Sequence, residues 1–191
     1  MMIGSTKQEV DKFGARVVKL ARINLGASRT IDGKKRVTNN TGALSKSLSY
    51  RIKQKRSNKG QFMSGFDVEF ISPLPYAHFI EQGVKGSEST PKGTSKSPFK
   101  FKGRNIKEGV VESWMKSKPI RIRDLGSGKF SKNTSTARKQ VAFLIGRKIA
   151  THGITARNYM TDAVEKTIHT NGDNVGIAMA KDFIIKQFKL A

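Results

Sequence analysis

The sequence predicts an α+β fold in which a small antiparallel sheet packs against a long N-terminal helix and C-terminal helices, with long basic insertion loops. Two neighbouring segments in the first half alternate apolar and charged residues, which is the two-residue period of strands. Segments near both ends instead repeat apolar residues at helical spacing. Since a domain has about 100 to 200 residues, we expect residues 1–191 to form a single domain.

The first helix is predicted over residues 6–25. Ser5 and Gln8 have the spacing of a capping box, in which two side chains satisfy free backbone groups of the first turn. Apolar residues then recur at helical intervals until Gly26, a residue type that commonly ends helices. The apolar residues of this stripe are Val10, Phe13, Val17, Ala21 and Leu25.

The next two segments predict a loop followed by a β-hairpin. Residues 26–41 mix turn-forming residues with a basic triplet, so we expect a loop that ends at a Thr41 cap. After a short turn from Gly42, alternation from Leu48 predicts a strand with a basic outer face, and beyond a turn at 57–60 a second strand has an acidic outer face. One register pairs apolar residues on the inner face and opposite charges on the outer face. Each such pair stabilises the sheet by about 0.2 to 1 kcal/mol. The predicted pairs are Tyr50 with Phe70, Ile52 with Val68, Arg51 with Glu69, and Lys53 with Asp67.

A short helix and a long loop are predicted after the hairpin. Pro73 and Pro75 end the second strand, and residues 76–83 predict a short helix closed by Gly83. Residues 84–104 are basic, rich in Ser, Gly and Thr, and have no sustained apolar period. We therefore expect this insertion to be a mobile basic loop.

The following segment predicts an amphipathic helix and a second insertion. The helix is expected over residues 106–118 with Trp114 in the core, and it stops before Pro119 because the residue ahead of a proline disfavours helical geometry. Residues 119–136 form the second insertion loop. It begins as a short edge strand and continues as a Gly/Ser/Lys-rich stretch that we expect to be disordered in isolation.

Two further helical regions are predicted at the C-terminal end. Apolar spacing marks a helix over residues 137–153 that ends near a glycine. Residues 159–190 predict either one long helix or two shorter helices interrupted around residues 171–173, where the sequence is Asn-Gly-Asp.

The charge of the chain restricts its partners. The 37 Lys and Arg residues outnumber the 14 Asp and Glu residues, which gives a formal net charge of +23. Such an excess favours polyanions as neighbours. The chain has no Cys, so disulfides and thiolate sites are excluded. No apolar run approaches the roughly 18 to 20 residues of a membrane span, and the start lacks the apolar core of a signal peptide, so we expect no membrane association.

The residue patterns of common catalytic and metal sites are absent from the sequence. His78, His152 and His169 lie far apart and lack the helical spacing of zinc ligands. The few acids show no close pair in an apolar setting that would separate two carboxyl pKa values. The glycines around Gly126 and Gly128 lack the spacing of a phosphate-binding loop. We therefore expect no enzymatic activity, no metal and no cofactor.

Two basic segments are candidates for contact with a polyanion or with another subunit. Cations can neutralise phosphates, and aromatic rings between them can stack on bases. The alternative for both segments is a solvated basic surface, and for the hairpin the two interpretations are evenly balanced because acids on the opposite strand can pair with its cations. The candidates are Arg51, Lys53 and Lys55 of the hairpin, and Lys92, Lys96, Lys100, Lys102 and Arg104 of the loop, with Phe99 and Phe101 between them.

Two short motifs occur in a recognisable order. Residues 40–48 read Asn-Thr-Gly-Ala-Leu-Ser-Lys-Ser-Leu, and residues 75–83 read Pro-Tyr-Ala-His-Phe-Ile-Glu-Gln-Gly. Together they resemble the HK97 gp10-like family of tailed-bacteriophage tail completion and head-tail joining (neck) proteins. Residues 106–118, 142–149 and 153–160 are similar to the later part of that family, so the resemblance spans roughly residues 6 to 190.

The resemblance implies a virion structural protein without catalysis. Members of the family complete the tail or join it to the head, usually as rings. The implied partners are copies of this chain, neighbouring portal, connector or tail proteins, and DNA in the channel; the implied location is the virion, and the host cytoplasm during assembly. The loops 84–104 and 119–136 are candidates for reaching neighbouring subunits. The implied architectural residues are Thr41, Gly42, Leu44, Tyr76, Phe79, Glu81 and Gly83. Of these, we expect Thr41 and Gly42 to cap and turn the chain into the first strand, and Tyr76, Phe79 and Glu81 to orient the short helix beneath the sheet.

The net charge also supports a second hypothesis, a free basic nucleic-acid-binding protein. This hypothesis predicts DNA affinity that falls steeply with salt. No recognised DNA-reading motif occurs in the sequence.

Overall fold

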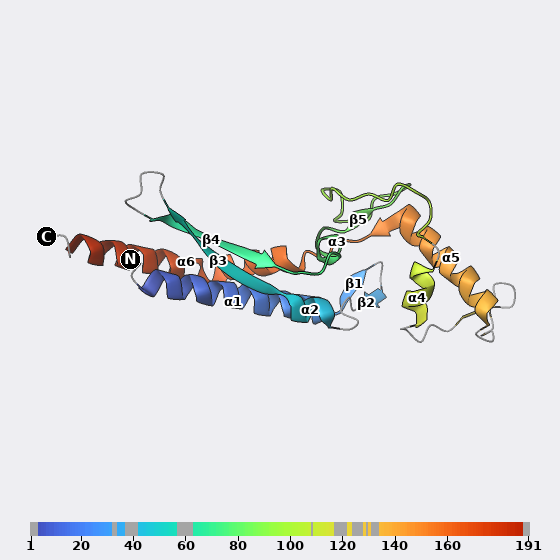
Figure 1. Ribbon diagram of the computed structural model, residues 1–191, viewed down its shortest axis with the longest axis horizontal. Coiled ribbons are helices and arrows are strands. Elements are labelled where there is room, and N and C mark those ends of the chain that lie inside the picture. Colours follow the sequence, from blue (N-terminus) through green and yellow to red (C-terminus); the bar gives the residue numbers. More distant parts are fainter. Residues whose placement is uncertain are drawn as a thin grey trace. The chain divides into compact units, whose positions relative to one another are not determined.

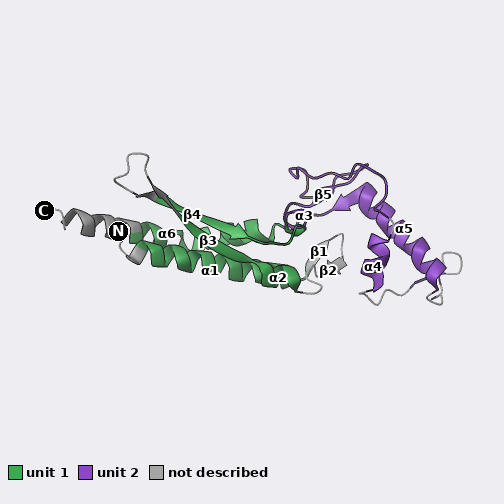
Figure 2. Cartoon of the chain, in the orientation of Figure 1, with its two compact units in different colours: residues 1–77, 158–191 green, residues 78–157 purple. Residues whose placement is uncertain are grey.

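The computed structural model confirms the α+β class: it has a long N-terminal helix, a small antiparallel sheet and C-terminal helices (Figure 1). The chain divides into two compact units, unit 1 (Met1–Ala77 and Asn158–Ala191) and unit 2 (His78–Arg157), shown in Figure 2. That residues 1–191 form a single domain stays a prediction. The structure describes residues 4–31, 34–36, 42–56, 63–107, 109–116, 122–123, 128, 130 and 134–188.

Two antiparallel helices form the base of unit 1. Helix α1 (Gly4–Gly26) runs alongside helix α6 (Tyr159–Phe188) in the opposite direction (Figure 1). The Asn24 side chain near the end of α1 donates a hydrogen bond of 3.0 Å to the carbonyl of Tyr159 at the start of α6. The helix predicted over residues 6–25 is therefore confirmed. Its predicted stripe is buried at Val10, Val17, Ala21 and Leu25 and half-buried at Phe13.

Helix α6 is continuous, which confirms one of the two alternatives for residues 159–190. Residues 171–173 lie inside it although Asn, Gly and Asp are poor helix formers. The Arg16 side chain of α1 donates a hydrogen bond to the side chain of Asn171. Packing against α1 thus outweighs the local propensity for a break.

The predicted hairpin and its register are confirmed. Strand β3 (Ser49–Arg56) pairs antiparallel with β4 (Met63–Ile71). On the outer face, Lys53 Nζ lies 2.5 Å from Glu69 Oε1, diagonally across the two strands. Both side chains are solvent-exposed, so this ion pair contributes little to stability. The four predicted pairs all occur: Tyr50 with Phe70, Ile52 with Val68, Arg51 with Glu69, and Lys53 with Asp67.

The Tyr50 ring packs the hairpin directly onto the backbone of α1. A Cβ atom at Gly14 would lie 2.6 Å from Cε2 and 3.0 Å from Cγ of this ring, so only glycine allows the approach. The Tyr50 hydroxyl donates a hydrogen bond of 2.9 Å to Asp11 Oδ1. Burial, followed by the hydrogen bond and the negative charge of Asp11, raises the pKa of Tyr50 above its ordinary value of 10.0.

A single helical turn leads into β3 where only a turn was expected. Helix α2 (Ala43–Ser47) begins after Gly42, whose φ is 74°, and it buries Leu44. The Arg22 guanidinium of α1 holds its other end, because Nε donates to Ser45 O at 3.1 Å and Nη2 to Leu48 O at 2.9 Å. These bonds satisfy carbonyls that a helix end leaves without partners.

The segment predicted as a loop over residues 26–41 contains two short strands. Strand β1 (Arg29–Ile31) pairs antiparallel with β2 (Lys34–Arg36), which corrects the prediction. The intervening sequence is Asp-Gly, a pair favoured in two-residue hairpin turns, and this signal was overlooked. The predicted Thr41 cap and the turn at 57–60 lie outside the described residues.

Unit 2 contains a helix pair. Helix α4 (Val110–Lys116) packs on α5 (Ser135–His152), which confirms the helix predicted over 137–153. Helix α4 begins later than the predicted residue 106, since Gly109 has a left-handed φ of 86°. The contact consists of Val111, Met115 and Ala142, with Ile106, Val141 and Ile145 around them.

Trp114 is 43% exposed, so its predicted place in the core is wrong. The stripe that packs on α5 runs through Val111 and Met115, and Trp114 lies to one side of it. Of the 119–136 insertion the structure describes few residues. Among them, Arg123 bridges to Phe130 in antiparallel fashion, and its guanidinium carbon lies 4.8 Å from the centre of the Phe130 ring.

We predict that Gly14→Ala destabilises the protein by about 1 to 3 kcal/mol, because the added methyl group overlaps the Tyr50 ring. The matched control is Gly176→Ala in α6, where nothing lies within 4 Å of the added Cβ. The control should gain up to about 1 kcal/mol from helix propensity. Urea unfolding measures both changes, and equal stabilisation by the two substitutions would contradict the proposed contact.

Candidate functional site

The basic loop over residues 84–104 is folded, in contrast to the mobile loop that the sequence predicted. Strand β5 (Val84–Lys85) pairs with β6 (Gly153–Ile154), which follows α5. The far end of the loop returns to the same strand: Lys85 N donates to Phe99 O at 2.9 Å, and Phe101 N donates to Lys85 O at 3.0 Å. Both ends of the loop are thereby fixed on β5.

The first residues of the loop cap the C-terminal end of α5. Ser87 N donates to Ala150 O at 2.9 Å, and Glu88 N and Ser89 N both donate to Thr151 O at 3.1 Å. The last carbonyls of a helix have no partner within the helix, so these bonds satisfy groups that would otherwise require water. The loop and the end of α5 therefore form one hydrogen-bonded structure.

Two buried hydroxyl side chains hold the middle of the loop. Thr94 is 0% exposed, and its Oγ1 accepts a 3.1 Å hydrogen bond from Ala156 N. Ser97 is 4% exposed; its Oγ donates to Gly83 O at 2.8 Å and accepts from Phe99 N at 3.2 Å. The prediction of mobility was wrong because polar side chains, without apolar periodicity, make the long-range contacts.

All five predicted cations of the loop are exposed on this folded segment. Only one of them has a described ion pair: Arg104 Nε lies 3.1 Å from Glu88 Oε1, and both side chains are exposed. The cations are Lys92, Lys96, Lys100, Lys102 and Arg104. Because the loop is already folded, presenting these charges to a polyanion requires little further ordering of the backbone.

The predicted hairpin cations belong to unit 1 and so form a separate candidate. Arg51 and Lys53 are exposed on β3. Lys53 already forms an ion pair with Glu69. The side chain of Lys55 lies outside the described residues. The hairpin is therefore the weaker of the two candidates for polyanion contact.

The motif at residues 75–83 forms helix α3 (Ala77–Gln82) and the turn after it. We expected its aromatic and acidic residues to orient the helix beneath the sheet. Within unit 2, the Phe79 ring packs edge to face on Phe99 of the loop, with centroids 4.7 Å apart. Phe79, and Tyr76 of unit 1, are both partly exposed. Helix α3 is held by the segment after β6, because Arg157 N donates to Ile80 O at 2.9 Å and to Glu81 O at 3.2 Å.

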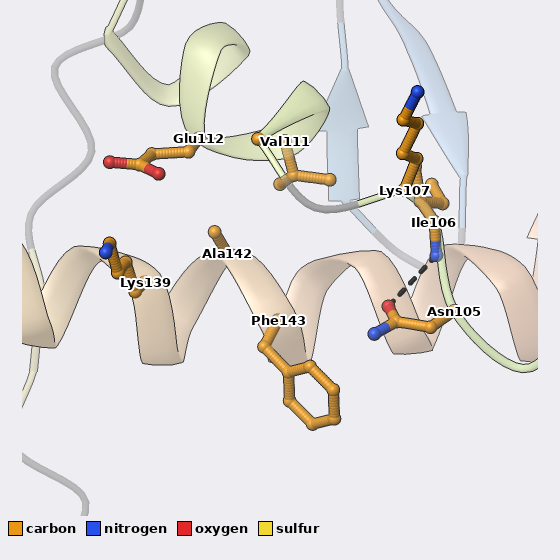
Figure 3. A pocket seen from close by; sticks show the side chains of 9 residues that line it. Asn105, Ile106, Lys107, Val111, Glu112, Lys139, Ala142 and Phe143 are labelled. Carbon is orange, nitrogen blue, oxygen red and sulfur yellow. Dashed lines mark hydrogen bonds between the residues drawn. The ribbon is translucent and has the colours of Figure 1, made fainter.

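A groove of about 230 Å³ lies between α4 and α5 (Figure 3). Val111 and Ala142 line its centre, Glu112 and Lys139 lie toward one end, and Asn105 lies toward the other. The groove offers one carboxylate, one amide and ammonium groups for binding a small polar ligand. Sequence reasoning missed it because its residues come from distant positions and share no motif.

We predict that Ser97→Ala costs about 1 to 2 kcal/mol of stability and raises amide exchange throughout residues 84–104, because it leaves buried backbone groups without partners. The matched control is Ser95→Ala, an exposed position on the same loop. Hydrogen exchange measured by mass spectrometry tests both variants. If Ser97→Ala leaves exchange in the loop at the control level, the buried hydroxyl does not hold it.

Comparisons with known proteins give no relative. No protein-family model matches the chain, and no curated protein or solved structure is significantly similar to it. Within the described ranges, no three side chains of His, Asp or Glu gather as they would around a metal ion. None of the described helices has the length and apolar character needed to cross a bilayer.

Proposed function

We propose that this chain is a structural virion protein of a tailed bacteriophage, which forms or completes a ring at the head-tail junction during assembly. The observation that carries the proposal is the order of the sequence motifs that resemble the HK97 gp10-like family. Two of these segments are also neighbours in the fold: residues 75–83 contact residues 153–160 through the hydrogen bonds of Arg157 N to Ile80 and Glu81. Segments that act together as an architectural unit are expected to meet in this way.

The exposed apolar side chains of unit 2 support a role in assembly. Trp114, Phe130 and Phe143 are each more than two-fifths exposed. Large apolar side chains on a surface are typical of sites that another protein covers. A ring subunit needs two different surfaces that meet head to tail. We propose that the ring contains copies of this chain and that portal, connector or tail proteins adjoin it.

The folded basic loop supports a polyanion as a further neighbour. Five exposed cations on the 84–104 loop, together with the +23 charge of the chain, favour DNA in the channel or an acidic face of an adjacent subunit. We propose that this loop makes the contact, with the 119–136 insertion as a second candidate for reaching a neighbour. The protein would act in the virion, and in the host cytoplasm during assembly, without catalysis.

The second candidate function is a free nucleic-acid-binding protein. The observation that favours it is the partly exposed Phe79 ring, which packs on Phe99 within the basic loop segment. Rings beside cations are used to stack bases of single strands. A free nucleic-acid-binding protein must bind DNA tightly as an isolated chain. A junction protein need only be incorporated into the assembled particle.

The proposal predicts a small, fixed number of copies in each particle. Quantitative mass spectrometry on density-purified, nuclease-treated particles from the source measures that number against the major capsid protein. About one ring per particle is expected for a closed cyclic assembly. Absence of the chain from purified particles would refute the virion role and favour the free DNA-binding protein.

The proposed polyanion contact predicts that charge reversal in the loop damages assembly. Changing Lys96, Lys100 and Lys102 to Glu should lower the yield of particles with nuclease-protected DNA by about tenfold or more, because three phosphate contacts become repulsive. The control reverses the same number of exposed charges on the helices of unit 1, at Lys7, Lys19 and Lys166. Normal assembly and DNA retention with the loop variant would refute the contact.

A further inference from the structure

Helix α5 has an exposed apolar face in addition to the face that packs on α4. Ala142 is buried against α4, whereas the next residue, Phe143, lines the groove beside α4 and has an exposed ring (Figure 3). Phe143 is 51% exposed and Leu144 is 44% exposed. Covering two adjacent large apolar side chains on an exposed helix face with another molecule is favourable, because it removes apolar surface from water.

Cations frame this apolar pair on both sides. Lys139 and Arg147 lie four positions before and after Phe143, which places them one helical turn away on the same face. Lys148 has the same relation to Leu144. The whole sequence of α5 contains no Asp or Glu. We define the α5 outer face as the exposed residues Lys139, Gln140, Phe143, Leu144, Arg147 and Lys148, of which Lys139 and Phe143 also line the groove beside α4.

We propose that the α5 outer face binds an acidic amphipathic helix of another protein. The face has an apolar centre and a charged rim, which is the organisation of protein interfaces. Its matching partner carries an apolar pair with acidic residues one turn before and one turn after, because side chains four positions apart are neighbours on any helix. Contact would bury Phe143 and Leu144 and neutralise the cations around them.

Charge selects this partner over two others. The α5 outer face of a second copy carries the same cations, so two such faces would repel each other. A nucleic acid would satisfy the cations, but its phosphate backbone offers no apolar surface to cover Leu144. The inference does not depend on the proposed virion function, since it follows from the composition and exposure of one helix.

The test uses the full chain and a synthetic helical peptide of about 20 residues, a length at which helices form in water. The peptide has a central Leu pair with Glu four positions before and after each Leu, and a second peptide has Lys in place of every Glu. Fluorescence anisotropy should give a Kd of the order of 10 µM for the acidic peptide and a Kd at least about tenfold higher for the basic one.

Two variants locate the binding site. The double variant Phe143→Ser and Leu144→Ser should weaken binding of the acidic peptide by about tenfold or more, because both side chains form the apolar centre. Both positions are exposed, so we expect the fold to be retained, which circular dichroism checks. The control is Ile168→Ser in α6, which removes an equally exposed apolar side chain from unit 1.

Three outcomes would overturn the inference. The first is equal affinity for the acidic and basic peptides, or no binding of either. The second is acidic-peptide affinity that is unchanged by the double variant. The third is a 20-bp duplex that binds the full chain and loses about tenfold affinity in the double variant but not in the Ile168→Ser control, which would assign the face to nucleic acid. None of these outcomes bears on the copy number in particles, so the proposed function is tested separately.

Discussion

Unit 2 depends on a close backbone contact between residues 83–89 and residues 150–157. Gly83 approaches the backbone of Ile154 and Ala156, and Gly86 approaches that of Thr151, so closely that a Cβ atom at either position would overlap them. The approach allows β5 to pair with β6 and the loop amides to cap α5. The position of the basic loop, the orientation of α3 and the end of α5 all follow from this one contact.

The two units are stabilised by different kinds of interaction. In unit 1, apolar residues such as Val17 and Leu25 are buried between helices, and the Tyr50 ring fits against Gly14. In unit 2, much of the loop is held by backbone hydrogen bonds and by the hydroxyls of Thr94 and Ser97. Apolar burial tolerates many substitutions of similar volume, whereas a buried hydroxyl that bonds two groups has few substitutes.

Sequence patterns were informative wherever structure follows a local period. The hairpin register could be predicted because both faces of two strands, such as Tyr50 inside and Arg51 outside, agreed on one pairing. The fold of the 84–104 loop could not be predicted, because its hydrogen bonds join residues far apart in the sequence. Thr94 bonds Ala156, 62 positions away, and neither residue belongs to an apolar stripe. Trp114 was misplaced because Val110 with Trp114 and Val111 with Met115 have the same helical spacing, and only the second pair packs on α5.

The capping of α5 by the loop has a consequence for how motion spreads through unit 2. Because Ala150 and Thr151 accept hydrogen bonds from the loop amides, fraying of the last turn of α5 and opening of residues 86–89 break the same bonds. The two events are therefore one cooperative opening. A molecule that restrains the last turn of α5 would therefore also disfavour opening of residues 86–89.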